Sequence, residues 1–262
     1  MLTEERFADV CTETAWHAKK FLDLISIHSE QEVRGRRPRA TLNPLTVLMA
    51  AAAWERFLND LAGAAFYPDE TWGERGASGL GRFQIPKIKR PDGKGWLSLP
   101  WEPEHLSPYL RRRGVLDRDL AAEWAAWLSF TWVGATPKGW VFAEYAQSAE
   151  TFRDVLKEVQ KVRNGVAHLA FPQDLAAARE SSYSWSNNAK TITVQSGHAR
   201  GLAAAVLQLI DASIVTVARS HHWPSEKHRL PAAWFRAEVP DSDSRYAGAR
   251  FWGGRRLHRL DS

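Results

Sequence analysis

The chain contains only one cysteine, Cys11, among its 262 residues, so no disulfide can form within one molecule. Such a sequence is typical of proteins that work in a reducing compartment. Its first residues are acidic and include no apolar signal region, and its longest apolar segment, residues 201–218, is interrupted by Gln208 and Asp211. Because this segment is only just long enough to cross a bilayer, we interpret it as a buried core helix. The sequence thus predicts a cytoplasmic protein with no membrane partner.

Several catalytic signatures are also missing. Residues 79–81 and 93–95 are glycine-rich but lack the Lys-Ser/Thr that completes a phosphate-binding loop, and no nucleophile-elbow pattern is present. His221, His222 and His228 have neither a cysteine nor a well-placed carboxylate to complete a metal site. We therefore expect neither a metal ion nor another cofactor.

The charge of the chain favours a polyanionic partner. Hydrophobic residues make up 44% and charged residues 25%, which is ordinary for a globular protein, but the net charge is +5. Arginines concentrate at residues 34–39, 111–113 and 255–259. Clusters of this kind bind nucleic acid in many proteins, although solvated surface charge explains any single cluster equally well.

Apolar periodicity predicts a mainly α protein, an up-and-down helical bundle with additions. We expect helices at residues 3–30, 44–66, 116–131, 152–168 and 199–219, with Asn43 as the cap of the second. The additions are an irregular insertion at 67–103 with one or two short strands, a turn at 136–139, a β-hairpin at 183–194, and a basic C-terminal extension at 221–262 with strands at 233–239 and 246–252. The bundle itself would then occupy residues 1–220.

The helix predicted at 152–168 has two different faces. Its apolar residues recur at the spacing of an amphipathic helix, and its polar residues gather opposite them. The apolar stripe consists of Phe152, Val155, Leu156, Val159, Val162 and Val166. The opposite face carries Lys157, Lys161, Asn164 and His168, and Arg163 lies at the edge of the stripe. This arrangement of cations, an amide and an imidazole is suited to bind a phosphate.

Glu55 occupies an unusual position in the helix predicted at 44–66. The apolar face of that helix is formed by Leu48, Ala51, Ala52, Leu58, Ala62 and Phe66. Glu55 falls inside this face, where a carboxylate is costly unless it is paired. Arg163 is a suitable partner, because a fixed carboxylate would orient its guanidinium. The pair can be purely structural or part of a catalytic site.

Arg163, Asn164 and His168, together with the Trp54-Glu55 helix, resemble the motif of the HEPN superfamily, and most closely its RiboL-PSP-HEPN branch. In that family an Arg is followed after four to six residues by a His, often with Asn, Asp or His directly after the Arg. The resemblance covers residues 1–220 in helix order, but only this motif and the Trp54-Glu55 helix are specific. It implies a metal-independent endoribonuclease that acts as a homodimer with facing motifs. Many members are toxins or antiphage effectors, so an antitoxin or defence protein is a further expected partner; others have lost activity.

The residue chemistry fits RNA cleavage by the neighbouring 2′-hydroxyl. His168 is the natural acid or base near neutral pH, and Arg163 can stabilise the charge that develops on the phosphate. We assign to Asn164 the orientation of His168 or of a phosphate oxygen, and to Glu55 the positioning of Arg163. Lys157 and Lys161 are candidate contacts to the RNA backbone, or else part of a solvated face.

Two other functions remain open. The chain can be a catalytically inactive HEPN-like module that binds a protein or nucleotide partner through the same face. It can also be a basic nucleic-acid-binding scaffold whose arginine clusters matter more than the motif. In either case Arg163 would pair with Glu55 only to hold the bundle together, and His168 would merely end a helix.

Overall fold

The computed structural model describes three long helices and several shorter segments around them. The described residues are 2–29, 42–66, 88–89, 96–97, 110–111, 114–117, 131–136, 139–144, 163, 196–238, 251–252, 254, 256–257 and 259. Within these ranges the chain is mainly helical, as the sequence predicts.

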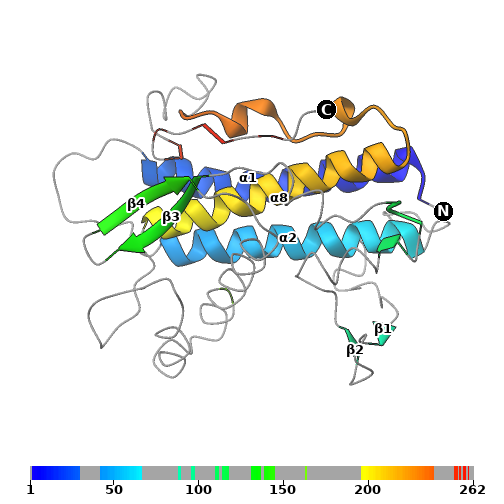
Figure 1. The fold of residues 1–262 in the computed structure, drawn as a ribbon, viewed down its shortest axis with the longest axis horizontal. Coiled ribbons are helices and arrows are strands. Elements are labelled where there is room, and N and C mark those ends of the chain that lie inside the picture. The colour runs from blue at the N-terminus through cyan, green and yellow to red at the C-terminus, as the bar shows by residue number, and fades with distance from the viewer. Residues whose placement is uncertain are drawn as a thin grey trace.

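The long helices are α1 (Glu4–Ser29), α2 (Leu42–Phe66) and α8 (Ser196–Ser220). They lie side by side, and α1 runs in the opposite direction to α2 and α8 (Figure 1). Their facing sides form one hydrophobic core, which also takes in side chains from the C-terminal segment. Full burial of a large apolar side chain such as Leu, Ile or Phe stabilises a fold by about 1.5–3 kcal/mol, so this shared core is the main source of stability.

Both ends of α1 lie within one residue of the sequence-based prediction, whereas α2 begins two residues early, at Leu42, and α8 three residues early, at Ser196. At the start of α1 the hydroxyl of Thr3 accepts a hydrogen bond from the backbone N–H of Arg6 at 3.4 Å, as a helix cap does. The second helix begins at Leu42, so Asn43 lies within its first turn and is not its cap. A shift of this size is common at helix ends.

The buried face of α2 differs from the predicted one. Trp54 and Phe57 are completely buried and form its centre, while Ala52, which the prediction placed on the apolar face, is exposed. The bulk of the Trp54 ring decides this rotation, because a large aromatic side chain gains more from burial than an alanine does. As a consequence Glu55 borders the buried face and is not inside it.

Helix α8 is almost completely enclosed. Residues Ala199–Ser220 are long and apolar enough to cross a membrane, but this stretch is fully buried inside the fold, as in the core helix of a globular protein. The helix also holds the buried carboxylate of Asp211, which accepts hydrogen bonds from charged partners. These features are consistent with the predicted core helix.

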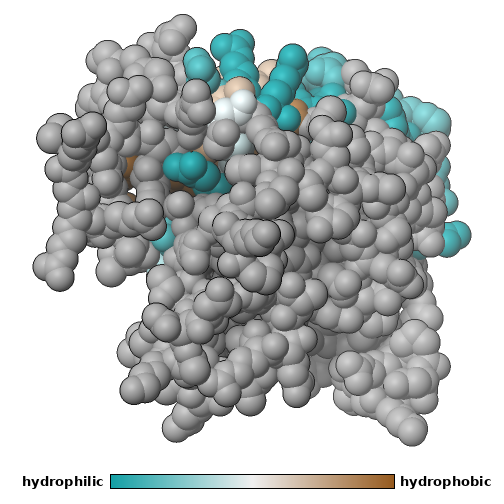
Figure 2. All heavy atoms as spheres, turned by 60° about the vertical axis from the view of Figure 1, so that its left-hand side comes forward, coloured by the Kyte–Doolittle hydropathy of each residue, from teal (hydrophilic) through white to brown (hydrophobic). Residues whose placement is uncertain are grey.

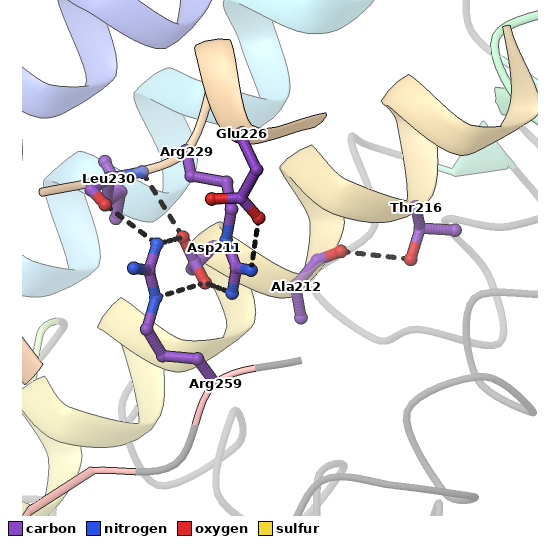
Figure 3. Close-up of polar contacts among 7 residues, drawn as sticks. All are labelled: Asp211, Ala212, Thr216, Glu226, Arg229, Leu230 and Arg259. Carbon is purple, nitrogen blue, oxygen red and sulfur yellow. Dashed lines mark hydrogen bonds and ion pairs between the residues drawn. The ribbon is translucent and has the colours of Figure 1, made fainter. Parts of the chain in front are cut away.

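Asp211 anchors the C-terminal segment to α8 (Figure 3). One carboxylate oxygen, Oδ2, accepts hydrogen bonds from Arg229 Nη2 at 2.8 Å and Arg259 Nε at 3.1 Å. The other, Oδ1, accepts from Arg259 Nη2 at 2.7 Å and from the backbone N–H of Leu230 at 3.2 Å. A carboxylate with 1% exposure is costly in isolation, and these four contacts offset that cost.

The C-terminal segment therefore packs into the common core. Phe235, Phe251, Trp252 and Leu257 are buried in it, and the segment follows α1 and α8 along one side (Figure 1). The strand predicted at 233–239 is wrong for its first part, because Ala232–Phe235 forms the 3-10 helix η2. Phe251 and Trp252, at the end of the strand predicted at 246–252, lie in a turn. Two hydrogen bonds link the described parts of these stretches, from Phe251 N–H to Ala237 C=O and from Trp252 Nε1 to Trp234 C=O.

Two short antiparallel pairs of strands accompany the helices. The pair β1 (Ile88–Lys89) and β2 (Trp96–Leu97) lies in the predicted insertion, where the sequence indicates one or two short strands. The pair β3 (Thr131–Thr136) and β4 (Gly139–Glu144) was not predicted, and β3 lies beside α8. The innermost pair of the hairpin is Thr136 with Gly139, which places the predicted turn between the strands.

The helix predicted at 116–131 is contradicted at its ends. Leu116 and Asp117 are not helical, and Thr131 begins a strand. Asp117 instead accepts a hydrogen bond from the hydroxyl of Ser220, at the end of α8, at 2.6 Å. Residues 118–130 and the hairpin predicted at 183–194 lie outside the described residues.

Candidate functional site

Glu55 is placed by the packing of the helix that carries it. Trp54 and Leu58 on either side of it are buried in the core, which fixes the rotation of α2 about its axis. The side chain of Glu55 therefore emerges at the border between core and solvent, with 29% of it exposed. One turn further along, Asn59 donates its side-chain N–H to the backbone carbonyl of Glu55 at 2.8 Å. The backbone at Glu55 is thus held by both helix packing and a local hydrogen bond.

Arg163 meets Glu55 across the bundle. Its Nη2 donates a hydrogen bond to Oε2 of Glu55 at 2.9 Å, although the two residues are 108 positions apart in the sequence. Arg163 has helical backbone geometry, and 28% of its side chain is exposed. This contact confirms the pairing that the sequence predicts. A charge-assisted bond of this length orients the guanidinium, while the partial exposure of both groups keeps them accessible from solvent.

The remaining predicted site residues lie outside the described part of the chain. These residues are Asn164, His168, Lys157 and Lys161. The structure thus brings together Glu55 and Arg163 and leaves the acid–base and RNA-contact assignments as predictions.

A second polar cluster adjoins Glu55 on the side of α2 that faces α1. Arg56 Nε donates to Asp60 Oδ2 at 2.7 Å, and the side chain of Asp60 is 1% exposed while that of Arg56 is 49% exposed. Burial raises the pKa of Asp60 to about 6, against the lowering influence of Arg56 and with a further increase from Glu13. A buried carboxyl with a pKa this close to neutrality is characteristic of functional sites, although structural ion pairs also produce it.

His17 of α1 belongs to the same cluster. Burial, together with the positive charges of Lys20 and Arg56, lowers the pKa of His17 to about 4. The imidazole is therefore neutral at physiological pH and can both donate and accept a hydrogen bond. Sequence reasoning missed this cluster, although the Arg56–Asp60 spacing of four residues on one helix is a signal for an ion pair.

Two of the three histidines that the sequence raised as weak metal candidates, His221 and His228, have other partners. His228 Nε2 lies 3.1 Å from Oε1 of Glu4, and His221 Nε2 lies 3.1 Å from the carbonyl oxygen of Val115. His221 also stacks on Trp223, with ring centroids 4.3 Å apart. Among the described residues, no group of three or more His, Cys, Asp or Glu side chains is arranged to hold a metal ion.

Comparison with known proteins gave no relative. No family model, no curated protein and no solved structure matches the chain. The functional argument therefore depends on the residues themselves, and above all on the Glu55–Arg163 pair.

Proposed function

We propose that the protein is a HEPN-like, metal-independent endoribonuclease. The observation that supports this function best is the contact between Arg163 and Glu55. A guanidinium at the start of the Arg-x4-His motif is held in a fixed position by a carboxylate from another helix, and it remains partly exposed. Preorganised cations of this kind stabilise the charge that develops on a reacting phosphate, because they need no rearrangement in the transition state.

The proposed reaction is an in-line displacement within the RNA strand. The 2′-hydroxyl oxygen forms a bond to the adjacent phosphorus while a base takes its proton, and the bond from phosphorus to the 5′-oxygen breaks as an acid donates a proton to that oxygen. The products carry a 2′,3′-cyclic phosphate and a 5′-hydroxyl. Arg163 binds the phosphate oxygens, His168 transfers a proton, and Asn164 orients His168 or a phosphate oxygen.

One histidine in each chain supplies only one of the two proton transfers. We therefore infer that two chains form a homodimer whose motif helices face each other, so that the second His168 completes the site. Lys157 and Lys161 would line the same cleft and contact the RNA backbone. Such an enzyme would act in the cytoplasm as a toxin or antiphage effector, under the control of an antitoxin or another defence protein.

An inactive HEPN-like binding module is the alternative that the same observation allows. An ion pair between Glu55 and Arg163 would also join two helices in a protein that only binds a protein or nucleotide partner. In that case the pair contributes to stability and to nothing else. A basic nucleic-acid-binding scaffold is a third reading, for which binding depends steeply on salt and not on His168.

The ribonuclease assignment is tested by incubating the purified protein with a mixture of RNAs in EDTA. Arg163→Ala and His168→Ala are assayed beside the wild type, and Lys227→Ala, an exposed cation remote in sequence from the motif, is the control. We expect cleavage by the wild type and the control, and intact RNA with the two motif variants. If all four proteins leave the RNA equally intact, the chain is not a ribonuclease under these conditions and the binding-module assignment replaces it.

A further inference from the structure

Trp16 on α1 is exposed to solvent. The other large aromatic side chains whose burial the structure describes lie deeper. The exposure of Trp16 is 57%, and Leu45 is the only other large hydrophobic residue in the described part of the chain that is classed as exposed. Trp54, by contrast, is completely buried. On the face drawn in Figure 2, the described residues that reach the surface are mainly hydrophilic, with few hydrophobic ones between them. An indole held at the surface is therefore a specific feature of α1.

A positive charge lies over one face of this indole. The Nζ of Lys20 lies 3.3 Å from the ring centroid of Trp16, and the imidazole of His17 meets the ring edge-on at 4.8 Å. Arg56 of α2 is close enough to affect the titration of His17, and half of its side chain is exposed. Two cations and an aromatic face within one cluster match the chemistry of single-stranded nucleic acid, in which stacked bases alternate with phosphates.

The negative charges near the cluster do not cancel this match. Asp60 is buried beneath Arg56 and already accepts its Nε–H, and Glu13 lies at the exposed surface of α1. A buried carboxylate that accepts from Arg56 holds the guanidinium in place, as Glu55 does for Arg163. Lys20 is the charged group that lies over the indole, and Lys20 and Arg56 are the two charges that act on its neighbour His17.

Helix α2 contributes a residue both to this cluster and to the proposed phosphate site. Glu55, which holds Arg163, and Arg56, which belongs to the Trp16 cluster, are consecutive residues of α2. Their α-carbons are therefore about 3.8 Å apart, and their side chains point about 100° apart around the helix. A strand of nucleic acid bound at Arg163 would pass over α2, where half of the Arg56 side chain is exposed, to reach α1.

We propose that Trp16, with Lys20 and Arg56, forms a stacking subsite for a base of the same single-stranded RNA whose phosphate Arg163 holds. This inference depends on the proposed function for the identity of its ligand. The base stacks on the face of the indole that Lys20 does not cover, and Lys20 and Arg56 contact the flanking phosphates. His17, which is neutral, offers a hydrogen bond to the base or ribose. The site selects unpaired RNA, because a base within a duplex cannot reach the indole.

The test is a binding assay that does not depend on cleavage. The wild-type chain is titrated into a labelled, fully 2′-O-methylated single-stranded oligonucleotide, which lacks the attacking hydroxyl, and binding is followed by fluorescence anisotropy. A second oligonucleotide has the same backbone without bases. We expect Trp16→Ala to raise the Kd for the first oligonucleotide about tenfold and to leave the Kd for the abasic one unchanged. Trp16→Phe, which keeps an aromatic face, should retain most of the affinity.

A pair of neighbouring lysines provides a matched control. Lys20→Gln should weaken binding and reduce the salt dependence by about one phosphate contact, whereas Lys19→Gln, an exposed neighbour that is not placed over the indole, should do so much less. Thermal melting of each variant checks that it folds; exposed substitutions of this kind change stability by about 0.5 kcal/mol or less.

Two outcomes would overturn the subsite. Trp16→Ala could bind the base-containing oligonucleotide as tightly as the wild type, or it could weaken both oligonucleotides equally, in which case the indole serves another purpose such as contact with a protein. The ribonuclease proposal is judged separately by cleavage of ordinary RNA. If the protein binds the bases through Trp16 but does not cleave RNA, the ribonuclease proposal is wrong and the subsite proposal stands. If the protein cleaves RNA and Trp16→Ala has no effect, the ribonuclease proposal stands and the subsite proposal is wrong.

Discussion

Arg163 donates a hydrogen bond to Glu55 at 2.9 Å, and almost equal parts of the two side chains, 28% and 29%, are exposed. Because water reaches both groups, their attraction is screened, and the pair contributes less than about 1 kcal/mol to stability. The value of the contact therefore lies in where it holds the guanidinium. This distinction between stability and position leads to the first prediction.

Removing the charge of Glu55 should affect catalysis more than folding. We expect Glu55→Gln to lower kcat for RNA cleavage about tenfold to a hundredfold with little change in KM, because the guanidinium loses its fixed position. The free energy of unfolding should change by less than about 1 kcal/mol. Steady-state kinetics and urea denaturation measure the two effects. A purely structural pair would show a stability loss with no separate change in kcat.

Asp211 should be far more important for stability than Glu55. Replacing it by Asn removes the negative charge that compensates Arg229 and Arg259, and we expect a loss of about 3–5 kcal/mol in urea denaturation. The matched control is Glu226→Gln, which removes an exposed contact to the same Arg229 and should cost less than about 1 kcal/mol. Equal effects of the two substitutions would show that the buried network does not anchor the C-terminal segment.

The Asp60–His17 cluster predicts two opposing pH dependences. The pKa of Asp60 is raised from 3.8 to about 6 in the folded protein, so between these pH values its carboxyl is more protonated in the folded than in the unfolded state. Its contribution to stability therefore falls as the pH rises from about 4 to 6. The pKa of His17 is lowered from 6.5 to about 4 in the folded protein, so between these pH values its imidazole is less protonated in the folded than in the unfolded state. Its contribution to stability therefore rises with pH over nearly the same range. The shift at Asp60 corresponds to about 3 kcal/mol.

Single substitutions should separate these contributions. In urea denaturation from pH 4 to 7, Asp60→Asn should gain stability with rising pH more steeply than the wild type, because only the His17 effect remains. His17→Gln should lose stability with rising pH, because only the Asp60 effect remains. If both variants keep the slope of the wild type, neither group titrates in this window and the burial argument is wrong.

The helical frame could be predicted because it follows from periodic patterns of side chains. The first and last helices were placed correctly, since their apolar residues recur at helical spacing over more than six turns. The pairing of Arg163 with Glu55 was also predictable, because a carboxylate near an apolar face needs a partner. That reasoning succeeded even though Glu55 borders the buried face and does not lie within it.

The features that were missed depend on contacts in the folded chain that the periodicity of apolar residues does not reveal. The strand β3 at Thr131–Thr136 was assigned to a helix end, and only its antiparallel pairing with β4 and its position beside α8 account for it. The C-terminal segment was expected as an appendage, but the pairing of Asp211 with Arg259 draws it onto α8. The Trp16 cluster was missed because the sequence pattern does not reveal which indole stays at the surface.

The most direct test of the central claim is the chemistry of the RNA ends. Mass spectrometry of a short RNA after incubation with the wild-type protein in EDTA identifies those ends, with His168→Ala in parallel. The proposed mechanism predicts 2′,3′-cyclic phosphate and 5′-hydroxyl termini from the wild type and uncut RNA from the variant. Uncut RNA with the wild type, termini bearing a 5′-phosphate, or equal cleavage by His168→Ala would contradict it.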